Sequence, residues 1–251
     1  MSTTFSERRE IILEVLAEAG SVSVSGLAKQ LGVTSVTVRA DLVALEEEGV
    51  LVRTHGGALP AFHSNILERS RRGRESKSVI AKAAAAEILN GDTVIISAGT
   101  TTALIAKYLL GKRDIHIVTN NTLLLTYARM NPQLRVTLVG GEFRASEEGM
   151  VGPIALAAID QFHVSKTFIG IDGVSVKQGF TAHFLESADL VRKMADQADE
   201  VIVVSDSSKF AKSGFARILQ FDEVDTLVTD GQLTSEFEEI LTHADVRVVK
   251  T

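Results

Sequence analysis

The stretch Gly32-Val33-Thr34-Ser35-Val36-Thr37-Val38-Arg39-Ala40-Asp41-Leu42 decides how the N-terminal part of this chain is interpreted. It predicts a tight turn and then a helix, because the Thr34 hydroxyl can accept a hydrogen bond from an unpaired amide of the first helical turn. Apolar residues at positions 38, 42 and 45 predict one buried stripe. The opposite side carries Ser35, Thr37 and Arg39, which are donors suited to reading base edges in a DNA major groove. The alternative is a small surface helix with an incidental arginine.

The sequence around this helix predicts two further helices and a hairpin. An amphipathic pattern over residues 6–19 has Ser6 as its cap and ends at Gly20, and a second, short helix begins at Ser25. The third helix runs to about Glu48, and two short extended runs follow around the pair Gly56-Gly57. Three helices and a hairpin in this order predict a winged helix-turn-helix, whose third helix enters the major groove.

The hairpin and the segment after it supply further candidate DNA contacts. In a winged domain the hairpin lies across the DNA backbone or in the minor groove, which gives Arg53 and His55 phosphate-contacting roles; His55 also fits an ordinary polar turn. Residues 61–76 are polar and arginine-rich, as in an exposed linker, and their arginines are either solvated or in contact with DNA. We therefore expect a DNA-binding domain over residues 1–60, a linker over 61–76 and a second domain over 77–251.

Composition excludes several classes of protein. The chain has 251 residues, of which 45% are hydrophobic, enough for a sizeable core, and it contains no cysteine, so disulfides, thiolate metal sites and cysteine nucleophiles are excluded. No apolar run is long enough to span a membrane, and the first residues contain no export signal, so a cytoplasmic protein is expected. The six histidines are scattered without metal-ligand spacing, and neither a metal nor another cofactor is expected.

The charge distribution limits how such a protein would hold DNA. The formal net charge is −6, and residues 1–60 contain five lysines and arginines against eight aspartates and glutamates. Residues 61–82 are basic, with six cationic side chains against two anionic ones. Bulk attraction to phosphate is therefore not expected. DNA binding would depend on a few well-placed cations, would weaken with salt, and would gain from pairing of two chains.

From residue 78 onward the pattern is that of an α/β domain. An alanine-rich helix over 78–89 precedes short β-rich runs that alternate with helical segments, which predicts a mainly parallel sheet covered on both faces. The expected strands are 93–97, 115–119, 135–139, 166–171, 201–205, 226–229 and 246–249, and the expected helices between them are 101–110, 122–130, 153–160, 185–198 and 234–243.

The carboxyl ends of these strands are where a ligand is expected to bind. After the first strand, Gly99-Thr100-Thr101-Thr102 leads into a helix and combines a close backbone approach, free amides and hydroxyl donors, which suits a phosphate group; the alternative is a simple capped turn. Lys209 could neutralise a phosphate and Asp172 could hold sugar hydroxyls. The expected ligand is a phosphorylated, polyhydroxylated small molecule, and its candidate contacts are Gly99, Thr100, Thr101, Thr102, Asn120, Gly140, Gly141, Asp172 and Lys209.

Taken together, these motifs resemble the DeoR family of bacterial transcription regulators. The resemblance covers essentially the whole chain and rests on the segments 6–9, 38–42, 45–46, Gly49, 55–58, 99–102, 118–120, 140–141, 168–170, 172–173 and 206–210. It implies a winged-helix DNA reader and a sensor domain similar to ribose-5-phosphate isomerase and the CoA-transferase-like fold. It also implies a homo-oligomeric repressor of carbohydrate-use genes that binds double-stranded operator DNA and is released by a phosphorylated sugar.

The chain departs from the family pattern at several positions. Ala40 stands where a second arginine often follows Arg39, which removes a cation, and Ser97 stands where the sensor loop usually begins with aspartate. Phe184 and Ser187 align with positions that carry Asp or Asn and Glu in many members; Glu186 lies close by and is not assigned a role. The lost carboxylates are expected to change which sugar fits.

Two other functions fit parts of the sequence. A sugar-phosphate isomerase with an accessory DNA-binding domain would need an acid–base group beside the reacting carbon. Asp172 is available, but positions 97 and 187 are serines. An architectural DNA-binding protein without a ligand would leave the α/β domain unexplained. We therefore expect a regulator without catalytic residues.

Overall fold

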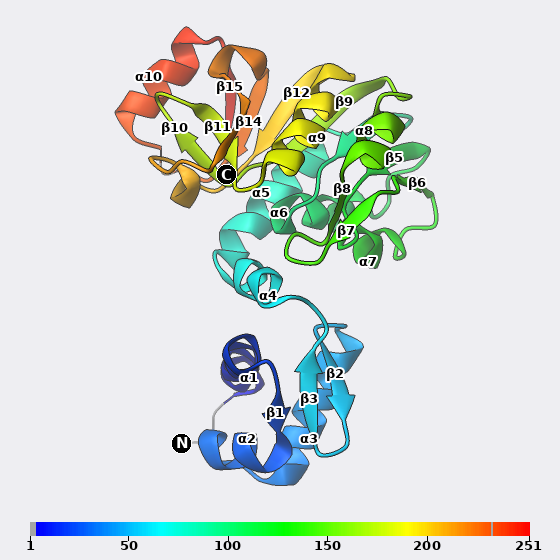
Figure 1. Ribbon diagram of the computed structural model, residues 1–251, viewed down its shortest axis with the longest axis vertical. Coiled ribbons are helices and arrows are strands. Elements are labelled where there is room, and N and C mark those ends of the chain that lie inside the picture. The colour runs from blue at the N-terminus through cyan, green and yellow to red at the C-terminus, as the bar shows by residue number, and fades with distance from the viewer. Residues whose placement is uncertain (1–3, 232) are drawn as a thin grey trace. The chain divides into compact units, whose positions relative to one another are not determined.

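The chain divides between Arg72 and Gly73 in a computed structural model that describes residues 4–231 and 233–251. The first compact unit ends at Arg72, and the second spans Gly73–Arg144 and Glu148–Thr251. Figure 1 shows the helices and the small hairpin of the first unit, and the large sheet of the second. Among the described residues, no helix combines the length and apolar character needed to cross a membrane.

The first unit is a winged helix-turn-helix. Its elements are α1 (Phe5–Ala19), β1 (Val22–Ser23), α2 (Val24–Leu31), α3 (Ser35–Glu47), β2 (Leu51–Thr54), β3 (Gly57–Pro60) and α4 (Ser64–Arg71). The stripe expected on α3 is confirmed, since Val38, Leu42 and Leu45 are at most 1% exposed. They share one core with residues of α1, α2, β2 and β3. Burial of this stripe fixes which side of α3 faces outward.

Helix caps explain where the helices begin. Thr34 caps α3 as expected, because its Oγ1 accepts a hydrogen bond from the Thr37 amide at 3.2 Å. The cap expected at Ser6 is wrong, because Thr4 caps α1 in a reciprocal pair with Glu7. The second helix begins at Val24, one residue before the expected Ser25, and Ser23 caps it. In both cases a residue two positions before the expected serine holds the extended conformation that a cap requires.

The hairpin β2–β3, called the wing below, is held against β1. Strand β3 pairs antiparallel with β2 and with β1. A Cβ atom on Gly57 would lie 2.0 Å from the Val22 carbonyl oxygen, so only glycine allows this approach. Gly56 turns the hairpin with φ of 90°, a conformation that side chains disfavour.

Residues 61–76 contain more regular structure than an exposed linker. Helix α4 occupies much of this segment, and its residues Ile66 and Leu67 are buried. Helix α5 (Arg74–Ala86) begins within the last residues of the segment. The two helices are separated by Arg72 and Gly73, and Gly73 has a left-handed φ of 62°. Two apolar residues among arginines were enough to dock a helix of eight residues, which a composition-based interpretation misses.

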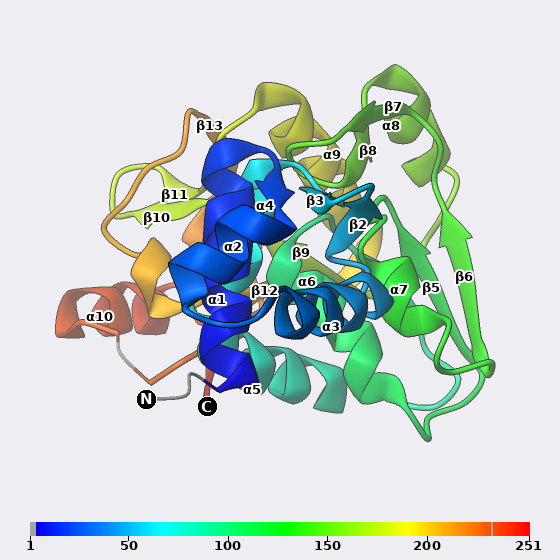
Figure 2. The ribbon, with the colours of Figure 1, turned by 90° about the horizontal axis from the view of Figure 1, so that it is seen from below.

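The second unit contains the expected parallel sheet. Its strand order is β15-β14-β12-β9-β4-β5-β6 and every neighbouring pair is parallel. The strands are β4 (Thr93–Ile96), β5 (Ile115–Thr119), β6 (Leu134–Leu138), β9 (Val164–Gly170), β12 (Ala198–Val204), β14 (Thr226–Thr229) and β15 (Arg247–Lys250). Figures 1 and 2 both place β6 at one edge of this sheet and α10 toward the other.

Helices cover both faces of the sheet, as expected. The connections contain α6 (Thr100–Ala103) with η1 (Leu104–Leu109), α7 (Leu124–Ala128), α8 (Pro153–Ile159), α9 (Leu185–Asp196) and α10 (Ser235–His243). Alternate residues of the strands face opposite sides: Ile96 and Phe168 pack with α5, α6, η1 and α7, whereas Ile95 packs with α8 and α9. The sheet is therefore buried on both sides, which matches its continuous apolar strands.

The second unit also contains short antiparallel strands that were not expected from the sequence. A hairpin of β7 (Glu142–Arg144) and β8 (Gly149–Val151) follows β6. A second sheet has the order β10 (Gly173–Ser175), β11 (Gly179–Ala182), β13 (Ala216–Leu219). Strands of three or four residues carry too few alternations to be recognised by periodicity. The remaining 3₁₀ turns are η2 (Ser207–Lys209) and η3 (Phe221–Glu223).

Candidate functional site

Helix α3 presents Arg39 to solvent. Its side chain is exposed and makes no hydrogen bond or ion pair with any residue that the structure describes. Ser35 and Thr37 are half-buried at the start of the same helix. The hydroxyl of Thr37 lies 3.0 Å from that of Thr34, so these two threonines are already engaged with each other in the helix cap. Among the candidate DNA contacts Thr34, Ser35, Thr37 and Arg39, Arg39 combines an exposed side chain with the absence of a hydrogen bond to any described residue.

Arg53 is held by α3. Its backbone amide donates to Glu46 Oε1 at 2.9 Å and its Nε donates to Glu46 Oε2 at 2.6 Å. The amide hydrogen bond, followed by the guanidinium hydrogen bond, lowers the pKa of Glu46 below its usual value. The wing is thereby tied to α3 through one carboxylate. His55 lies exposed at the turn of the wing.

A buried ion pair fixes α3 to α1. Arg8 Nε donates to Asp41 Oδ2 at 2.6 Å and Arg8 Nη2 donates to Asp41 Oδ1 at 2.8 Å, with the Asp41 side chain only 5% exposed. Sequence reasoning assigned no role to either residue. A signal was present, because Asp41 lies in the buried stripe of α3, where a carboxylate requires a partner.

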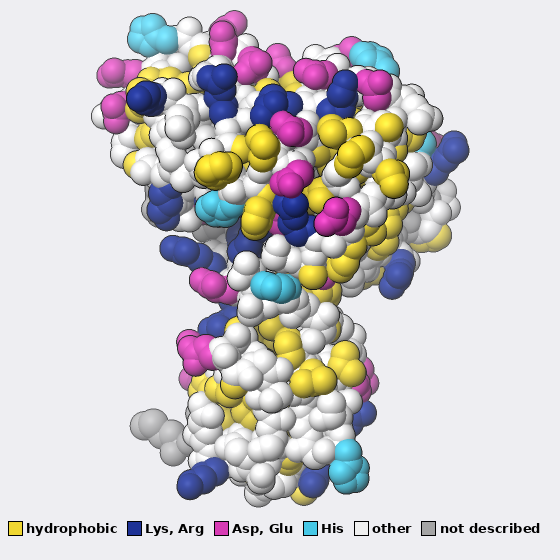
Figure 3. Space-filling view, in the orientation of Figure 1, with side chains coloured by type: hydrophobic (Ala, Val, Ile, Leu, Met, Phe, Trp, Pro, Cys, Tyr) yellow, Lys and Arg dark blue, Asp and Glu magenta, His cyan; other side chains and the backbone are white. Residues whose placement is uncertain are grey.

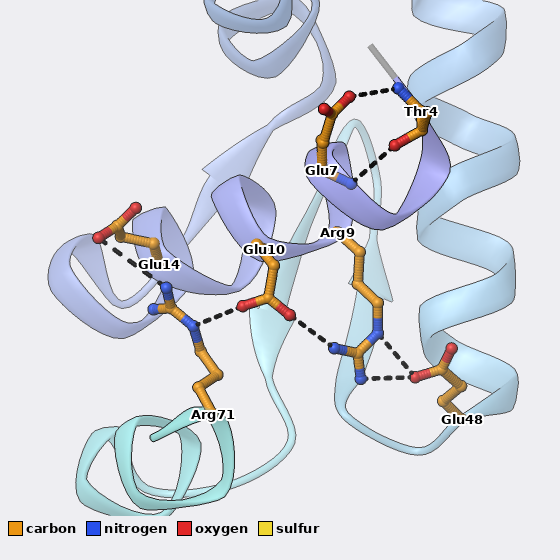
Figure 4. A network of polar contacts seen from close by, with 7 residues as sticks. All are labelled: Thr4, Glu7, Arg9, Glu10, Glu14, Glu48 and Arg71. Atoms are coloured by element: carbon orange, nitrogen blue, oxygen red, sulfur yellow. Dashed lines mark hydrogen bonds and ion pairs between the residues drawn. The ribbon is translucent and has the colours of Figure 1, made fainter. Parts of the chain in front are cut away.

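A second network of charges links α1 to α3 and α4 (Figure 4). Arg9 Nη2 lies 2.8 Å from Glu48 Oε2, and Arg9 also contacts Glu10. Arg71 of α4 bridges Glu10 and Glu14, at 3.3 and 3.9 Å. Arg71 is therefore neither a solvated linker charge nor an available DNA contact.

These pairings leave few cations for DNA. Among residues 4–60, Arg8, Arg9 and Arg53 are in ion pairs, whereas Lys29 on α2 and Arg39 on α3 are exposed and in none. In a helix-turn-helix the first helix crosses the DNA backbone and the second enters the groove. Lys29 and Arg39 are thus exposed cations on the two helices of the helix-turn-helix.

In the second unit, the order of strands marks where a ligand is expected. From β4 the chain continues through β5 to β6 on one side, and then returns to β9, β12, β14 and β15 on the other. The reversal lies between β4 and β9, and ligands of open parallel sheets bind outside the carboxyl ends of the strands at such a point. Ser97 Oγ there accepts a hydrogen bond from the Gly170 amide at 2.9 Å, which joins the ends of the two strands.

The segment Ser97–Thr102, called the sensor loop below, follows β4 and is rigidly held. Thr102 Oγ1 donates to the carbonyl oxygens of Ser97 and Gly99, and Asn121 Nδ2 donates to the same two oxygens at 3.2 and 3.0 Å. The backbone amides of Gly99, Thr100 and Thr101 make no hydrogen bond within the described part of the chain. The loop thus keeps donors open, while the Thr102 hydroxyl is used to shape it.

Asn120 and Gly141 position the hairpin β7–β8. Asn120 Oδ1 accepts from the Ala98 amide at 2.7 Å and its Nδ2 donates to the Met150 carbonyl at 2.9 Å, so both ends of the amide are engaged. A Cβ on Gly141 would lie 2.6 Å from the Val151 carbonyl oxygen, whereas Gly140 has open space. The structure therefore gives Asn120 and Gly141 a part in joining the sensor loop to the hairpin.

Asp172 follows β9, the neighbour of β4, and Lys209 follows β12, the neighbour of β9. Asp172, after β9, accepts a hydrogen bond from the His183 amide at 2.9 Å through Oδ2. Lys209 ends η2, directly after β12, and is half-buried; Asp206 caps this turn through the Ser208 amide. Since β4, β9 and β12 are neighbours, the fold brings the sensor loop, Asp172 and Lys209 to the same edge of the sheet.

Comparisons with known proteins agree with both halves of this arrangement. A family model described as a DeoR-like helix-turn-helix domain matches residues 8–61, and one described as the DeoR C-terminal sensor domain matches residues 72–231. The chain belongs to the DeoR family of transcriptional regulators.

Curated DeoR-family relatives are similar over nearly the whole chain. The chain is 32% identical to a putative aga operon transcriptional repressor of Escherichia coli O157:H7, over 98% of this chain and 94% of that protein. It is 32% identical to the transcriptional repressor GlcR of Bacillus subtilis, over 98% and 96%. It is 29% identical to the glycerol-3-phosphate regulon repressor of Escherichia coli K12, over 97% and 98%.

Solved structures with a related fold are more distant. Ribose-5-phosphate isomerase A from Methanocaldococcus jannaschii matches with a TM-score of 0.41 at 16% identity, over 55% of each chain. The tetrameric eIF2B-beta2-delta2 complex from C. thermophilum matches with a TM-score of 0.47 at 14% identity, over 96% of this chain and 88% of that one.

This DeoR-family member has a group of side chains around Arg144 that sequence reasoning missed. The guanidinium carbon of Arg144, on β7, lies 4.6 Å from the centroid of the Phe184 ring. Its Nη2 is 3.3 Å from Glu186 Oε2, and its Nη1 donates to Ser187 Oγ at 3.5 Å. The pKa of Glu186 is lowered by its own backbone amide and then by Arg144. Arg144 thus contacts the segment that departs from the family pattern.

Proposed function

We propose that this DeoR-family regulator represses a carbohydrate-use operon and leaves its operator when a phosphorylated sugar binds the second unit. The observation that carries the proposal is the exposed, unpartnered Arg39 on the outward side of a helix that the fold aligns by burial and by an ion pair. The relatives named as repressors of the aga operon and of the glycerol-3-phosphate regulon support the sugar-related role.

On DNA, we assign base reading to Arg39 together with Ser35, and phosphate contact to His55 and Lys29. Thr34 and Thr37 shape the start of the helix through their mutual hydrogen bond. Arg53 positions the wing through Glu46, and its partly exposed guanidinium adds a charge beside the DNA backbone. Because the first unit of one chain offers few cations, high operator affinity depends on two chains acting on two half-sites.

In the sensor unit, we assign the phosphate group of the effector to the open amides of Gly99, Thr100 and Thr101, with Lys209 neutralising its charge. Asp172 is assigned the sugar hydroxyls. Support comes from the position of these residues at the reversal of strand order, and from the hydrogen bonds that hold the sensor loop in shape without using those amides. Asn120, Thr102 and Gly141 act by shaping the loop and the adjoining hairpin, whereas Gly140, which has open space around it, stays a candidate effector contact.

We infer that the site binds without catalysis. Isomerisation needs an acid–base group beside the reacting carbon. Asp172 Oδ2 already accepts the His183 amide, and Ser97 Oγ accepts the Gly170 amide. Ser97 and Ser187 moreover offer no second carboxylate beside Asp172 for an acid–base pair.

Self-association is supported by an exposed apolar surface of the second unit. Figure 3 shows apolar side chains gathered over the region where Figure 1 places α8, α9 and the hairpin β7–β8. Phe143, Ile154, Phe184 and Leu185 are each between 39% and 70% exposed. We assign this surface to contact with a second copy of the chain, and Ile154→Glu should lower the mass measured by sedimentation.

The proposal is tested with the full chain in two steps. Random duplexes are first selected for binding, and enrichment of one sequence is expected. The enriched duplex is then titrated in the presence of pentose, hexose, triose and amino-sugar phosphates. Release of the duplex by one of them, without turnover of that compound, supports the proposal. Enrichment without release by any compound, or rapid turnover, would overturn the sensor role.

A further inference from the structure

The exposed side of α3 differs from the side expected from its hydrogen-bond donors Ser35, Thr37 and Arg39. Val36, Arg39 and Ala40 are its exposed residues near the start of the helix, whereas Ser35 and Thr37 are half-buried. Val36 is 73% exposed. We call Val36, Arg39 and Ala40 the reading face. It consists of one forked cation between two apolar side chains, spaced three and four residues apart, which places them on one side of a helix.

The exposure of Val36 has no use within the unit. The core of this unit is formed by other residues, with Val33 of the same turn partly buried against it. A β-branched residue in a helix also has a lower propensity than alanine, so valine at position 36 does not help α3 to form. Its exposed methyl groups are available for contact with a partner outside the unit.

The position of the reading face selects what that contact is. The N-terminal residues of a recognition helix are those that reach base edges. Along α3 the rise from Val36 to Arg39 is roughly 4.5 Å and that from Val36 to Ala40 roughly 6 Å. Base pairs are stacked about 3.4 Å apart, so the three side chains meet edges within one to two base pairs of each other.

The major groove offers one kind of apolar group to such side chains. Arginine pairs with the O6 and N7 acceptors of guanine, whereas the C5-methyl group of thymine is the apolar feature of the base edges. We propose that the reading face recognises a guanine through Arg39 and flanking thymine methyl groups through Val36 and Ala40. This inference rests on the proposed DNA-reading function and names the bases that it reads.

It follows that each half-site contains a guanine with thymines one or two base pairs away. The hydroxyl groups at positions 34 and 37 do not compete for these bases, because they lie 3.0 Å apart in the helix cap. Ala40 has a specific part in this: a small methyl side chain allows close approach to a thymine, where a longer cationic residue would reach for phosphate or guanine instead.

The experiment uses the full chain and the duplex enriched from the random library. Each thymine of the half-site is replaced in turn by uracil, which removes only the 5-methyl group. At one or two positions beside the guanine we expect affinity to fall roughly fourfold, the effect of exposing one buried methyl group. Replacing cytosine by 5-methylcytosine elsewhere should have no effect.

Variants link the methyl effect to Val36. In Val36→Ser, affinity for the thymine duplex should fall by a similar factor, and the uracil substitution should then cost nothing further. Val36→Thr, which keeps one methyl group, should retain part of the sensitivity. The matched control is Val79→Ser, at a 47% exposed valine on α5, which should leave the uracil sensitivity unchanged. Melting curves establish that Val36→Ser folds.

The outcomes separate the two proposals. If no duplex is enriched, DNA reading itself fails. If a duplex is enriched but uracil is tolerated at every thymine, or if Val36→Ser keeps the full uracil sensitivity, the assignment of Val36 is overturned while DNA reading stands. A guanine without a neighbouring thymine in the enriched sequence would also overturn it.

Discussion

Arg8 and Asp41, separated by 33 residues in sequence, form a two-point hydrogen-bonded ion pair at 2.6 and 2.8 Å. Asp41 lies two residues after Arg39 on α3, but on the buried side of the helix. Rotation of α3 about its axis would break both bonds. The pair therefore helps to set which residues of α3 face outward, and the reading face depends on a residue of α1 that lies outside it.

The variant Asp41→Asn tests this dependence. The amide keeps the shape of the side chain but removes the negative charge that pairs with Arg8 in a mostly buried position, which destabilises the unit. The melting temperature of the first unit should fall by several degrees, and operator affinity should fall without a change in preferred bases. Glu47→Gln removes a charge from an exposed position of the same helix and is the control. Equal melting temperatures for the two variants would contradict the assigned role.

Arg39 and Lys29 should differ in the kind of affinity they provide. Arg39→Ala should cost about 1–3 kcal/mol of operator affinity and relax the preference for guanine at one position, since it removes a base contact. Lys29→Ala should weaken binding to all duplexes alike and reduce the salt dependence by about one phosphate contact. Titrations of the enriched and a scrambled duplex at several salt concentrations distinguish the two. An Arg39→Ala variant with unchanged sequence preference would remove Arg39 from the base-reading set.

Local periodicity explains what could be predicted from the sequence. The stripe Val38, Leu42 and Leu45 repeats with the helical period, and the strands of the parallel sheet are apolar runs set between helical segments; both were predicted with nearly correct bounds. Thr34 was recognised as a cap because capping involves residues only three apart.

Contacts between distant residues explain what could not be predicted. The pairs Arg8–Asp41 and Arg53–Glu46 depend on the packing of separate elements, so the sequence showed Arg53 only as a cation of the wing. The hairpin β7–β8 depends on the glycines at 141 and 149, whose small size matters only against Val151 and Ala98. The reading face could be recognised only from the exposed fraction of Val36, since a valine on a helix usually faces the core.

The bond from Arg53 to Glu46 predicts a pH dependence of the first unit. Because the pKa of Glu46 is lowered by folding, its contribution to stability is fully present above the unfolded value of about 4.3 and is lost as the pH falls through the lower folded value. Between neutral pH and acid, wild type should therefore lose more stability than Glu46→Gln. Unfolding measured from pH 7 to pH 3 gives this comparison, and parallel curves would show that Glu46 does not anchor the wing.

The sensor loop should be sensitive to the loss of Asn121. Its amide donates to two carbonyl oxygens of the loop and its Oδ1 accepts from the Leu123 amide, all in a buried position. Asn121→Ala removes these hydrogen bonds and leaves the Leu123 amide without its acceptor, whereas the two carbonyl oxygens keep the Thr102 hydroxyl as a donor. The loss should cost about 1–3 kcal/mol of stability in the second unit. Gln178→Ala, at an exposed turn, is the control and should have almost no effect. Urea unfolding of the two variants measures the difference.

Substitution of Lys209 should weaken effector binding and leave DNA binding unchanged. A lysine that neutralises a phosphate group makes a charge-assisted contact worth about 1.5–3 kcal/mol, so Lys209→Gln should weaken the effector by roughly tenfold to a hundredfold. Operator affinity without effector should not change, because Lys209 belongs to the second unit. Lys212→Gln removes the same charge from an exposed position three residues later and is the matched control. The measurement is the concentration of the active sugar phosphate that releases half of the duplex. Equal values for the two variants would exclude Lys209 from the phosphate site, whereas a loss of operator affinity in Lys209→Gln would mean that it acts on the fold instead.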